Sequence, residues 1–284
     1  MSGPFRTFDT GRELWRTVIH ERLSVSMRHS RDGDCREIQG GSWTLTDPER
    51  AWINDGNRKA SLRYGCAELL WYLSGTDDGW IEHYAPQYKR FLEEDGTAFG
   101  AYGKRWADFG QLGFVLREIG TDSRRAVMQC WAPERDIAQA ERNGKDVPCT
   151  LSLQFLREDD RLNLIVTMRS NDAWLGLPYD MFCFTMIQRL VAGALNLKCG
   201  FYTHQAGSMH LYERNATKAA NCLRSWTSNG DHAPSGTIPT GPISMFEQLS
   251  RAVRAEYQSR VHGMDHSDNL ERDSMMRMVV EAVL

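Results

Sequence analysis

Cys149 is a candidate nucleophile in this 284-residue chain. It lies in the segment DVPCT, residues 146–150, at the start of an expected strand. Most free cysteines are buried and behave as small apolar residues. Here, however, Arg124, Arg125 and Arg169 are expected on neighbouring strands, and nearby positive charge lowers the pKa of a thiol. The pattern therefore allows Cys149 to act as a nucleophile.

A polar turn with the sequence RSND, residues 169–172, follows an expected strand at residues 161–168. Four adjacent polar side chains are costly to bury without partners, so the turn indicates a site more than a core. Its arginine carries the planar fork that binds phosphate oxygens in pairs. Further along the chain, strand alternation within residues 207–212 places His210 and Tyr212 on one face.

The composition of the chain disfavours several classes of function. The formal net charge is −3, from 34 basic and 37 acidic residues, which disfavours a protein that coats nucleic acid but allows a basic pocket for one small anion. The seven cysteines never form a CxxC pair, so neither a disulfide framework nor a metal site is expected, and a cytoplasmic location fits best. We expect no signal peptide and no membrane span.

The elements that must position these residues follow no regular βαβ rhythm. Apolar spacing predicts helices at residues 11–29, 59–74, 78–95, 179–195, 243–258 and 270–283. Apolar and β-branched patterns predict strands at residues 124–131, 150–157 and 161–168. Loops are expected at residues 98–106 and 227–242. Since no linker divides the chain, we expect one α/β domain over residues 1–284, with a helical extension at residues 216–284.

Seven segments occur in the order found in the thymidylate synthase superfamily, which this chain resembles between about residues 11 and 215. They are Ser30–Gly33, Glu68–Leu73, Tyr102–Trp106, Asp122–Arg125, Pro148–Cys149, Arg169–Asp180 and His210–Tyr212. Each segment is weak evidence alone, but all seven in order are specific. The resemblance implies a thymidylate synthase-like fold with a mixed six-stranded sheet and flanking helices. It also implies a homodimer in which two sheets pack face to face.

The resemblance further implies a mechanism. The thiolate of Cys149 would add to C6 of a pyrimidine nucleotide, and C5 would then attack the methylene carbon of 5,10-methylenetetrahydrofolate. Glu68 would organise proton transfers through water, and Tyr102 would support removal of the proton from C5.

Binding roles also follow from the resemblance. The phosphate would be held by Arg31, Arg169 and Ser170, with Arg124 and Arg125 shared across the two subunits. The sugar 3′-hydroxyl would be held by His210 and Tyr212, and Asn171 would lie beside the substrate. The folate contacts would be Asp172, Tyr88, Trp174 and Gly176. No stable nucleic-acid or membrane partner is expected.

Asp180 is the most informative departure from the synthases, which have Asn at this position after Leu-Pro-Phe. An amide offers one donor and one acceptor, which match N3–H and O4 of uracil. An ionised carboxylate only accepts, so it matches the amino group of cytosine, and N3 as well when N3 is protonated. Asp180 therefore favours a cytidine nucleotide, although an Asp in the first turn also complements the helix dipole.

Further departures concern the end of the reaction. Thr150 follows the nucleophile where synthases have His, Asn171 stands where many have Cys, and Tyr88 replaces a Trp. Together with Asp180, residues 149–150 and 169–172 resemble phage deoxycytidylate hydroxymethylases, in which water rather than hydride attacks the new exocyclic carbon. We therefore expect a cytidylate 5-hydroxymethylase, with dCMP preferred over CMP. The alternatives are a cytidylate C5-methylase, a thymidylate synthase or dUMP hydroxymethylase, and a catalytically silent nucleotide- or RNA-binding relative.

Overall fold

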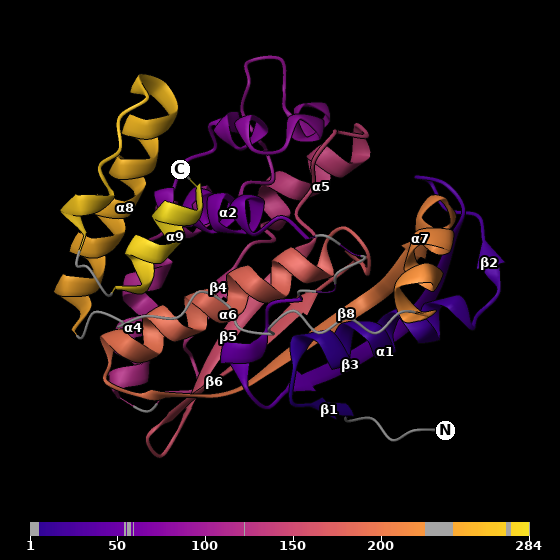
Figure 1. The fold of residues 1–284 in the computed structure, drawn as a ribbon, viewed down its shortest axis with the longest axis horizontal. Coiled ribbons are helices and arrows are strands. Elements are labelled where there is room, and N and C mark those ends of the chain that lie inside the picture. Colours follow the sequence, from indigo (N-terminus) through magenta and orange to yellow (C-terminus); the bar gives the residue numbers. More distant parts are fainter. Residues whose placement is uncertain are drawn as a thin grey trace.

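The computed structural model describes residues 6–53, 55, 58, 60–121, 123–224, 241–270 and 274–283. Asp122 and most of the loop expected at residues 227–242 lie outside these ranges. One mixed sheet forms the centre of the described fold, with helices arranged around it (Figure 1). No described helix combines the length and the apolar character that a membrane crossing requires.

The sheet contains eight strands within the described residues, six of them in a continuous order β1-β3-β8-β6-β5-β4. The two short strands β2 and β7 pair with β3 and β8. Strand β8 runs parallel to β6 and antiparallel to β3, so the expected mixed α/β sheet is confirmed. The strands are β1 (Arg6–Phe8), β2 (Met27–Arg28), β3 (Cys35–Leu45), β4 (Val127–Gln129), β5 (Thr150–Glu158), β6 (Arg161–Met168), β7 (Asn171–Asp172) and β8 (Lys198–Tyr212).

Helix α6 (Leu177–Ala194) packs against the sheet and is buried along almost its whole length. Pro178 lies in its first turn, where a fixed φ and a missing N–H are tolerated. Gln188 donates hydrogen bonds to the carbonyls of Leu162 at 2.8 Å and Phe201 at 3.0 Å. These bonds fasten α6 to β6 and β8, and the N-terminus of α6 is thereby held at a fixed place over the sheet.

Helix α2 (Leu62–Ser74) has clear signals at both ends. The Ser61 hydroxyl caps its start by accepting from Tyr64 N at 3.1 Å, and Gly75 ends it in the left-handed conformation with φ +69°. The helices α8 (Pro242–His262) and α9 (Met275–Val283) pack against α2, as Figure 1 shows on the left. Their buried side chains belong to the same hydrophobic cluster as the rest of the core.

Two expectations about local structure are wrong. Residues 98–106, expected to be a loop, contain the start of helix α3 (Tyr102–Asp108), whose aromatic and glycine content masks its helical spacing. Residues 78–95, expected to be one helix, form two short 3-10 helices, η2 (Gly79–His83) and η3 (Pro86–Phe91). Pro86 is the first residue of η3, and its missing N–H prevents one continuous helix through this segment.

Arg124 and Arg125 do not lie on a strand, contrary to expectation. The strand expected at residues 124–131 is only β4, and both arginines lie in the turn before it, with exposed side chains. Other described elements were not expected from the sequence: α4 (Gln111–Gly120), α5 (Pro133–Glu141) and the strands β1, β2, β3, β7 and β8 over their full lengths. Helix α7 (Glu213–Arg224) lies mostly within the helical extension expected from residue 216. The expected helix at residues 11–29 is α1 (Gly11–Leu23).

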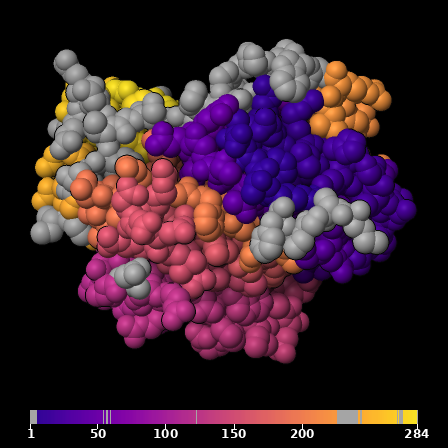
Figure 2. Space-filling view, turned by 90° about the horizontal axis from the view of Figure 1, so that it is seen from below, coloured from indigo at the N-terminus to yellow at the C-terminus, as the bar shows by residue number. Residues whose placement is uncertain are grey.

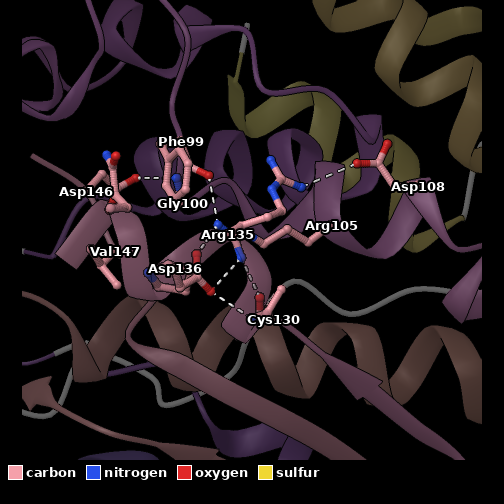
Figure 3. A network of polar contacts seen from close by, with 12 residues as sticks. Phe99, Gly100, Arg105, Asp108, Cys130, Arg135, Asp136, Asp146 and Val147 are labelled. Carbon is pink, nitrogen blue, oxygen red and sulfur yellow. Dashed lines mark hydrogen bonds and ion pairs between the residues drawn. The ribbon is translucent and has the colours of Figure 1, made fainter. Parts of the chain in front are cut away.

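A buried ion pair joins α3 to α5 (Figure 3). The Arg105 guanidinium binds both carboxylate oxygens of Asp136, at 2.7 and 2.9 Å, and also donates to the carbonyls of Cys130 at 2.8 Å and Phe99 at 3.1 Å. The nearby Gly100 N–H donates to Asp146 at 3.0 Å. This network fixes the segment that leads into Tyr102 and the segment that leads into Cys149.

The substitution Asp136→Asn should destabilise the protein by about 3–5 kcal/mol, because it leaves the buried Arg105 charge uncompensated. Denaturant unfolding at pH 7 measures this loss. The matched control is Asp160→Asn, which breaks the exposed pair between Asp160 and Lys198 and should change stability little. Equal effects of the two substitutions would contradict a structural role for the buried pair.

Candidate active site

Cys149 lies immediately before β5 and is half-buried. Arg169, from the end of β6, holds the segment that carries it: Nε donates to the Pro148 carbonyl and Nη2 to the Val147 carbonyl, both at 2.9 Å. The Arg169 backbone N–H also donates to the Cys149 carbonyl at 2.8 Å. Three hydrogen bonds from one residue therefore set the position of the thiol.

Burial raises the pKa of the Cys149 thiol to about 11 in the single chain. The charge of Arg169 opposes this rise, as does the more weakly acting Arg31, while Asp180 and Asp146 add to it. Arg169 therefore acts in the expected direction, but burial has the larger effect, so the expected net lowering of the pKa is wrong for the chain alone. Arg124 and Arg125 lie in an exposed turn and are not among the main influences on this thiol.

Tyr102 lies beside the nucleophile. Its hydroxyl accepts a hydrogen bond from the Thr150 N–H at 3.2 Å, directly after Cys149. Its ring packs with Tyr72 of α2 at 5.2 Å and with Phe184 of α6 at 6.5 Å between centroids. The structure thus brings together Cys149 and Tyr102, as the sequence predicts.

Glu68 lies on α2 with its carboxyl group buried at 8% exposure. Tyr64 donates to one carboxyl oxygen at 2.8 Å, and the Cys183 thiol approaches the other at 3.8 Å. The pKa of Glu68 is raised to about 8. Burial is the largest cause of this rise, and the charge of Asp180 is the second. Glu68 is therefore mostly protonated at neutral pH.

Asp180 lies in the first turn of α6 and is also 8% exposed. Asn171 donates from Nδ2 to one of its carboxylate oxygens at 2.5 Å. Burial raises the pKa of Asp180 to about 7, the Asn171 hydrogen bond lowers it, and the charge of Asp172 raises it. Burial is the main reason that Glu68 resists ionisation, and the negative charge of an ionised Asp180 adds to it.

Gly176 leaves space for this pair of side chains. A Cβ atom at position 176 would lie 3.1 Å from the Asp180 carboxylate and 3.2 Å from the Asn171 amide nitrogen. Asp172, on the neighbouring strand β7, accepts from the backbone N–H groups of Trp174 at 2.8 Å and Leu175 at 3.1 Å through one oxygen. Its other oxygen has no hydrogen-bond partner among the described residues, so it can accept from a ligand.

His210 and Tyr212 share one face of β8, with ring centroids 4.9 Å apart. The Ser170 hydroxyl lies 3.5 Å from His210 Nδ1, which connects the polar turn to this strand. Arg31 is exposed and pairs with Asp32, and its charge reaches both Tyr212 and Cys149. Arg31 thus links this group of residues electrostatically to Cys149.

Two further residues, Tyr88 and Trp174, were predicted to contact the folate, and they lie in different surroundings. Tyr88, in η3, packs edge-on against Trp71 at 5.3 Å and lies close enough to Glu68 and Cys149 for their charges to act on it. Trp174 is only 6% exposed and packs between Trp15 at 5.8 Å and the Arg58 guanidinium at 4.8 Å. A folate contact by either residue stays a prediction.

The family model described as thymidylate synthase matches residues 52–239, about two thirds of the chain. This chain belongs to the thymidylate synthase family. The predicted resemblance is thereby confirmed, and with it the use of 5,10-methylenetetrahydrofolate as cosubstrate. The open carboxylate oxygen of Asp172 fits a ring N–H donor of that folate. A one-carbon transfer to a pyrimidine nucleotide is the reaction that this membership supports.

Three individual relatives show which enzymes of the family this chain is similar to. A deoxyuridylate hydroxymethyltransferase of Delftia phage PhiW-14 is 26% identical over 264 residues, covering 87% of this chain and 73% of the relative. A deoxyuridylate hydroxymethyltransferase of Pseudomonas phage M6 is 30% identical over 57% of the chain and 48% of the relative. A thymidylate synthase of Francisella philomiragia is 28% identical over 52% of the chain and 60% of the relative. The last two are thus matched over less than two thirds of their length.

Sequence reasoning missed Tyr64 and Cys183, which contact Glu68 in this thymidylate synthase family member. Tyr64 lies four residues before Glu68 on a helix, and this spacing alone places the two side chains on one face. Cys183 likewise lies three residues after Asp180, one turn along α6. Helical spacing around each predicted catalytic carboxyl was the signal that would have found both.

The substitution Glu68→Gln should make the protein more stable at pH 8 and leave it nearly unchanged at pH 4. The native state keeps a proton on Glu68 up to about pH 8, whereas the unfolded chain loses it near pH 4.3, so the wild type loses stability as pH rises between these values. A gain on the order of a few kcal/mol at pH 8 is expected. Urea unfolding at both pH values measures it, with the exposed Glu134→Gln as control. A gain that does not depend on pH would contradict the raised pKa.

Proposed function

We propose that this protein is a cytidylate 5-hydroxymethylase, with dCMP preferred over CMP. The observation that carries the proposal is the carboxyl group of Asp180, where the synthases have an amide. It is buried, and it lies near the thiol closely enough for its charge to act on Cys149. In the ionised form it can only accept hydrogen bonds, which suits the amino group of cytosine and opposes the O4 carbonyl of uracil.

The chemistry at the base makes this distinction stronger during reaction. When the Cys149 thiolate adds to C6, electron density moves toward N3 and the group on C4. For cytosine N3 gains a proton, which leaves the adduct neutral, and the carboxylate of Asp180 accepts hydrogen bonds from the new N3–H and from the amino group. For uracil the charge collects on O4, which a carboxylate repels. Asp180 therefore favours cytosine more in the transition state than in binding.

The proposed product is the 5-hydroxymethyl nucleotide. The folate supplies one carbon at the oxidation level of formaldehyde, and water supplies the oxygen, so tetrahydrofolate is released without oxidation. Glu68 is placed to hold and transfer a proton, since it is protonated at neutral pH and fixed by Tyr64. Tyr102 would take part in removing the C5 proton. The relatives that are named hydroxymethyltransferases support water as the final reactant.

A second candidate function is hydroxymethylation of dUMP. It is favoured by the names of the two phage relatives, both deoxyuridylate hydroxymethyltransferases. A protonated Asp180 would present a donor and an acceptor, as an amide does, and in that form would accept uracil. The choice between the two functions therefore depends on the ionisation of one carboxyl group.

We propose a cytoplasmic location for this protein. All seven cysteines are free thiols, as proteins of a reducing compartment usually have.

Competition among dCMP, CMP and dUMP, with 5,10-methylenetetrahydrofolate present, tests this function by product mass. We expect a gain of one CH2O unit on a cytosine nucleotide. Asp180→Asn should shift the ratio of kcat/KM values from dCMP toward dUMP by at least about tenfold. Cys149→Ala should form no product from any of the three nucleotides.

The matched control is Asp146→Asn, which alters a half-buried carboxyl whose pKa burial raises to about 6. It should change the rate without changing the ratio of bases. A product that gains only CH2 would identify a methylase, and dUMP as the preferred wild-type substrate would establish the second candidate. No product from any nucleotide would favour the silent binding relative.

We also propose that the active unit is a homodimer built on the open face of the sheet. Successive side chains of a strand point to opposite faces of the sheet. In β6, Leu164 and Val166 are buried on one face, and Ile165 is half-buried on the other. Ile165, Leu156 and Phe201 lie half-buried on strands whose other face is covered by α6. Figure 2 shows residues from the N-terminal third and from the middle of the chain sharing one face of the molecule. Pairing of two such faces would bury these apolar side chains.

Arg124 and Arg125 are the residues that this dimer would share across subunits. Both side chains are exposed, and in the single chain the Arg125 guanidinium binds Glu118 of α4 and the Ser123 hydroxyl. Positive charge brought to the pocket by a second subunit would lower the pKa of the Cys149 thiol from its single-chain value. The dimer would thus supply the activation that the isolated chain lacks.

Mixed dimers test this sharing. One parent carries Cys149→Ala and the other carries Arg124→Ala with Arg125→Ala, and each parent should be nearly inactive. Random pairing in equal amounts should restore about a quarter of wild-type activity, because half of the dimers contain one intact site. Arg117→Ala is the exposed control and should retain activity. Mixtures of confirmed dimers that stay inactive would show that the arginines serve their own subunit.

A further inference from the structure

Asn171 has an unusual relation to Asp180. Its amide nitrogen donates to the Asp180 carboxylate at 2.5 Å and lies 3.2 Å from the Met168 sulfur, and the side chain is only 3% exposed. Its carbonyl oxygen is buried and has no hydrogen-bond partner among the described residues. Rotating the amide by half a turn would place that oxygen against the carboxylate and the sulfur. The orientation of Asn171 is therefore set by the need to donate.

The other groups that act on Asp180 do not stabilise its charge. Of the influences on its ionisation, only the Asn171 hydrogen bond favours the charged form, while burial and Asp172 oppose it. The titratable groups whose own ionisation is coupled to Asp180 are all acids, and they come from every element packed around it. They are Glu68, Tyr72, Tyr88, Tyr102, Cys130, Cys149, Cys183 and Tyr202, together with Asp172.

We propose that Asn171 is a positioning residue that keeps Asp180 in its accepting form and thereby makes the pocket select cytosine over uracil. The inference rests on the proposed function and deepens it. An accepting Asp180 suits the amino group and the protonated N3 of cytosine, whereas a neutral Asp180 can donate to O4 of uracil. Asn171 acts through Asp180 and needs no contact of its own with the reacting atoms.

The space around the pair agrees with this role. Gly176 has no side chain, and a Cβ there would lie about equally close to the carboxylate and to the amide. The Asp180 backbone N–H donates to the Gly176 carbonyl at 2.9 Å, which fixes the first turn of α6. The carboxylate is thus held by its own helix on one side and by Asn171 of β7 on the other.

The test is the ratio of kcat/KM for dCMP over dUMP, measured with both nucleotides in one reaction from pH 6 to pH 9. This ratio does not depend on how much of a variant is folded, so a destabilised enzyme still gives an answer. In the wild type the ratio should rise with pH as Asp180 ionises, with a midpoint near pH 7. Asn171→Ala should move this midpoint upward by about one to two pH units, because a hydrogen bond to the charged form is lost.

Two further variants make the result specific. Asn171→Ser retains a donor and should move the midpoint less than Asn171→Ala does. The matched control is Asn163→Ala, because Asn163 is also buried on a strand and donates to a carboxylate, that of Glu158, at 3.1 Å. It should cost stability but leave the ratio and its midpoint unchanged.

The outcomes separate this inference from the function on which it rests. A wild type that converts dCMP, with the same midpoint in Asn171→Ala, would overturn the role of Asn171 and leave the proposed function standing. A wild type that converts only dUMP at every pH would overturn both. A midpoint that moves equally in Asn163→Ala would show a general effect of destabilisation and would also overturn the role.

Discussion

The burial of two carboxyl groups without a cation beside them is the constraint on which this site depends. Glu68 and Asp180 are each 8% exposed, and their side chains receive hydrogen bonds from neutral donors, Tyr64 and Asn171. A buried carboxyl in such surroundings resists ionisation, and the one that ionises first makes the second still harder to ionise. Burial is the main cause of the raised pKa of both groups, the Asn171 hydrogen bond favours the charged form of Asp180, and that charge adds to the raised pKa of Glu68. The hydrogen bond between β7 and α6 thus contributes to the protonation of both carboxyl groups.

The arginines near the site serve mainly to hold backbone. Arg169 binds the carbonyls of residues 147 and 148, and Arg105 binds those of residues 99 and 130 together with Asp136. The first sets the position of Cys149, and the second sets the approach to Tyr102. Both arginines lower the pKa of Asp146, but neither is among the main influences on the pKa of Glu68 or of Asp180. The site therefore combines backbone segments held by arginines with two buried carboxyl groups of raised pKa.

The sequence was sufficient to predict the family, because seven short segments mark it. Residue type within the same segments also suggested the nucleophile and the acids, whose catalytic roles stay predictions. Helix α6 and the strands β5 and β6 were predicted because their apolar patterns are long and uninterrupted. The full length of β8 was not, since Gly200 and Gly207 break its pattern while long-range pairing with β3 and β6 maintains the strand. Local propensity does not record such pairing.

The direction of the Cys149 pKa shift shows a second limit of sequence reasoning. Proximity of arginines in the chain suggested a lowered value, but the effect of a cation depends on what it binds and on how deeply the thiol is buried. Arg169 does lower the pKa of Cys149 but burial raises it more, and the exposed Arg125 is bound to Glu118. Neither fact has a signature in the residue order. Distances between groups on separate elements had to be known before the sign of the shift could be assigned.

The same reasoning explains how related enzymes of this family can differ in the base they accept. Uracil and cytosine differ at C4 and N3 by the exchange of one donor and one acceptor, so one side chain is enough to read the difference. An amide reads uracil at any pH, whereas a carboxyl group reads cytosine when ionised and tolerates uracil when neutral. A chain that places Asp at this position must therefore also control its proton, and the neighbour that does so becomes part of the specificity. In this protein that neighbour is Asn171, three residues after the last residue of β6 and nine before the carboxyl it holds.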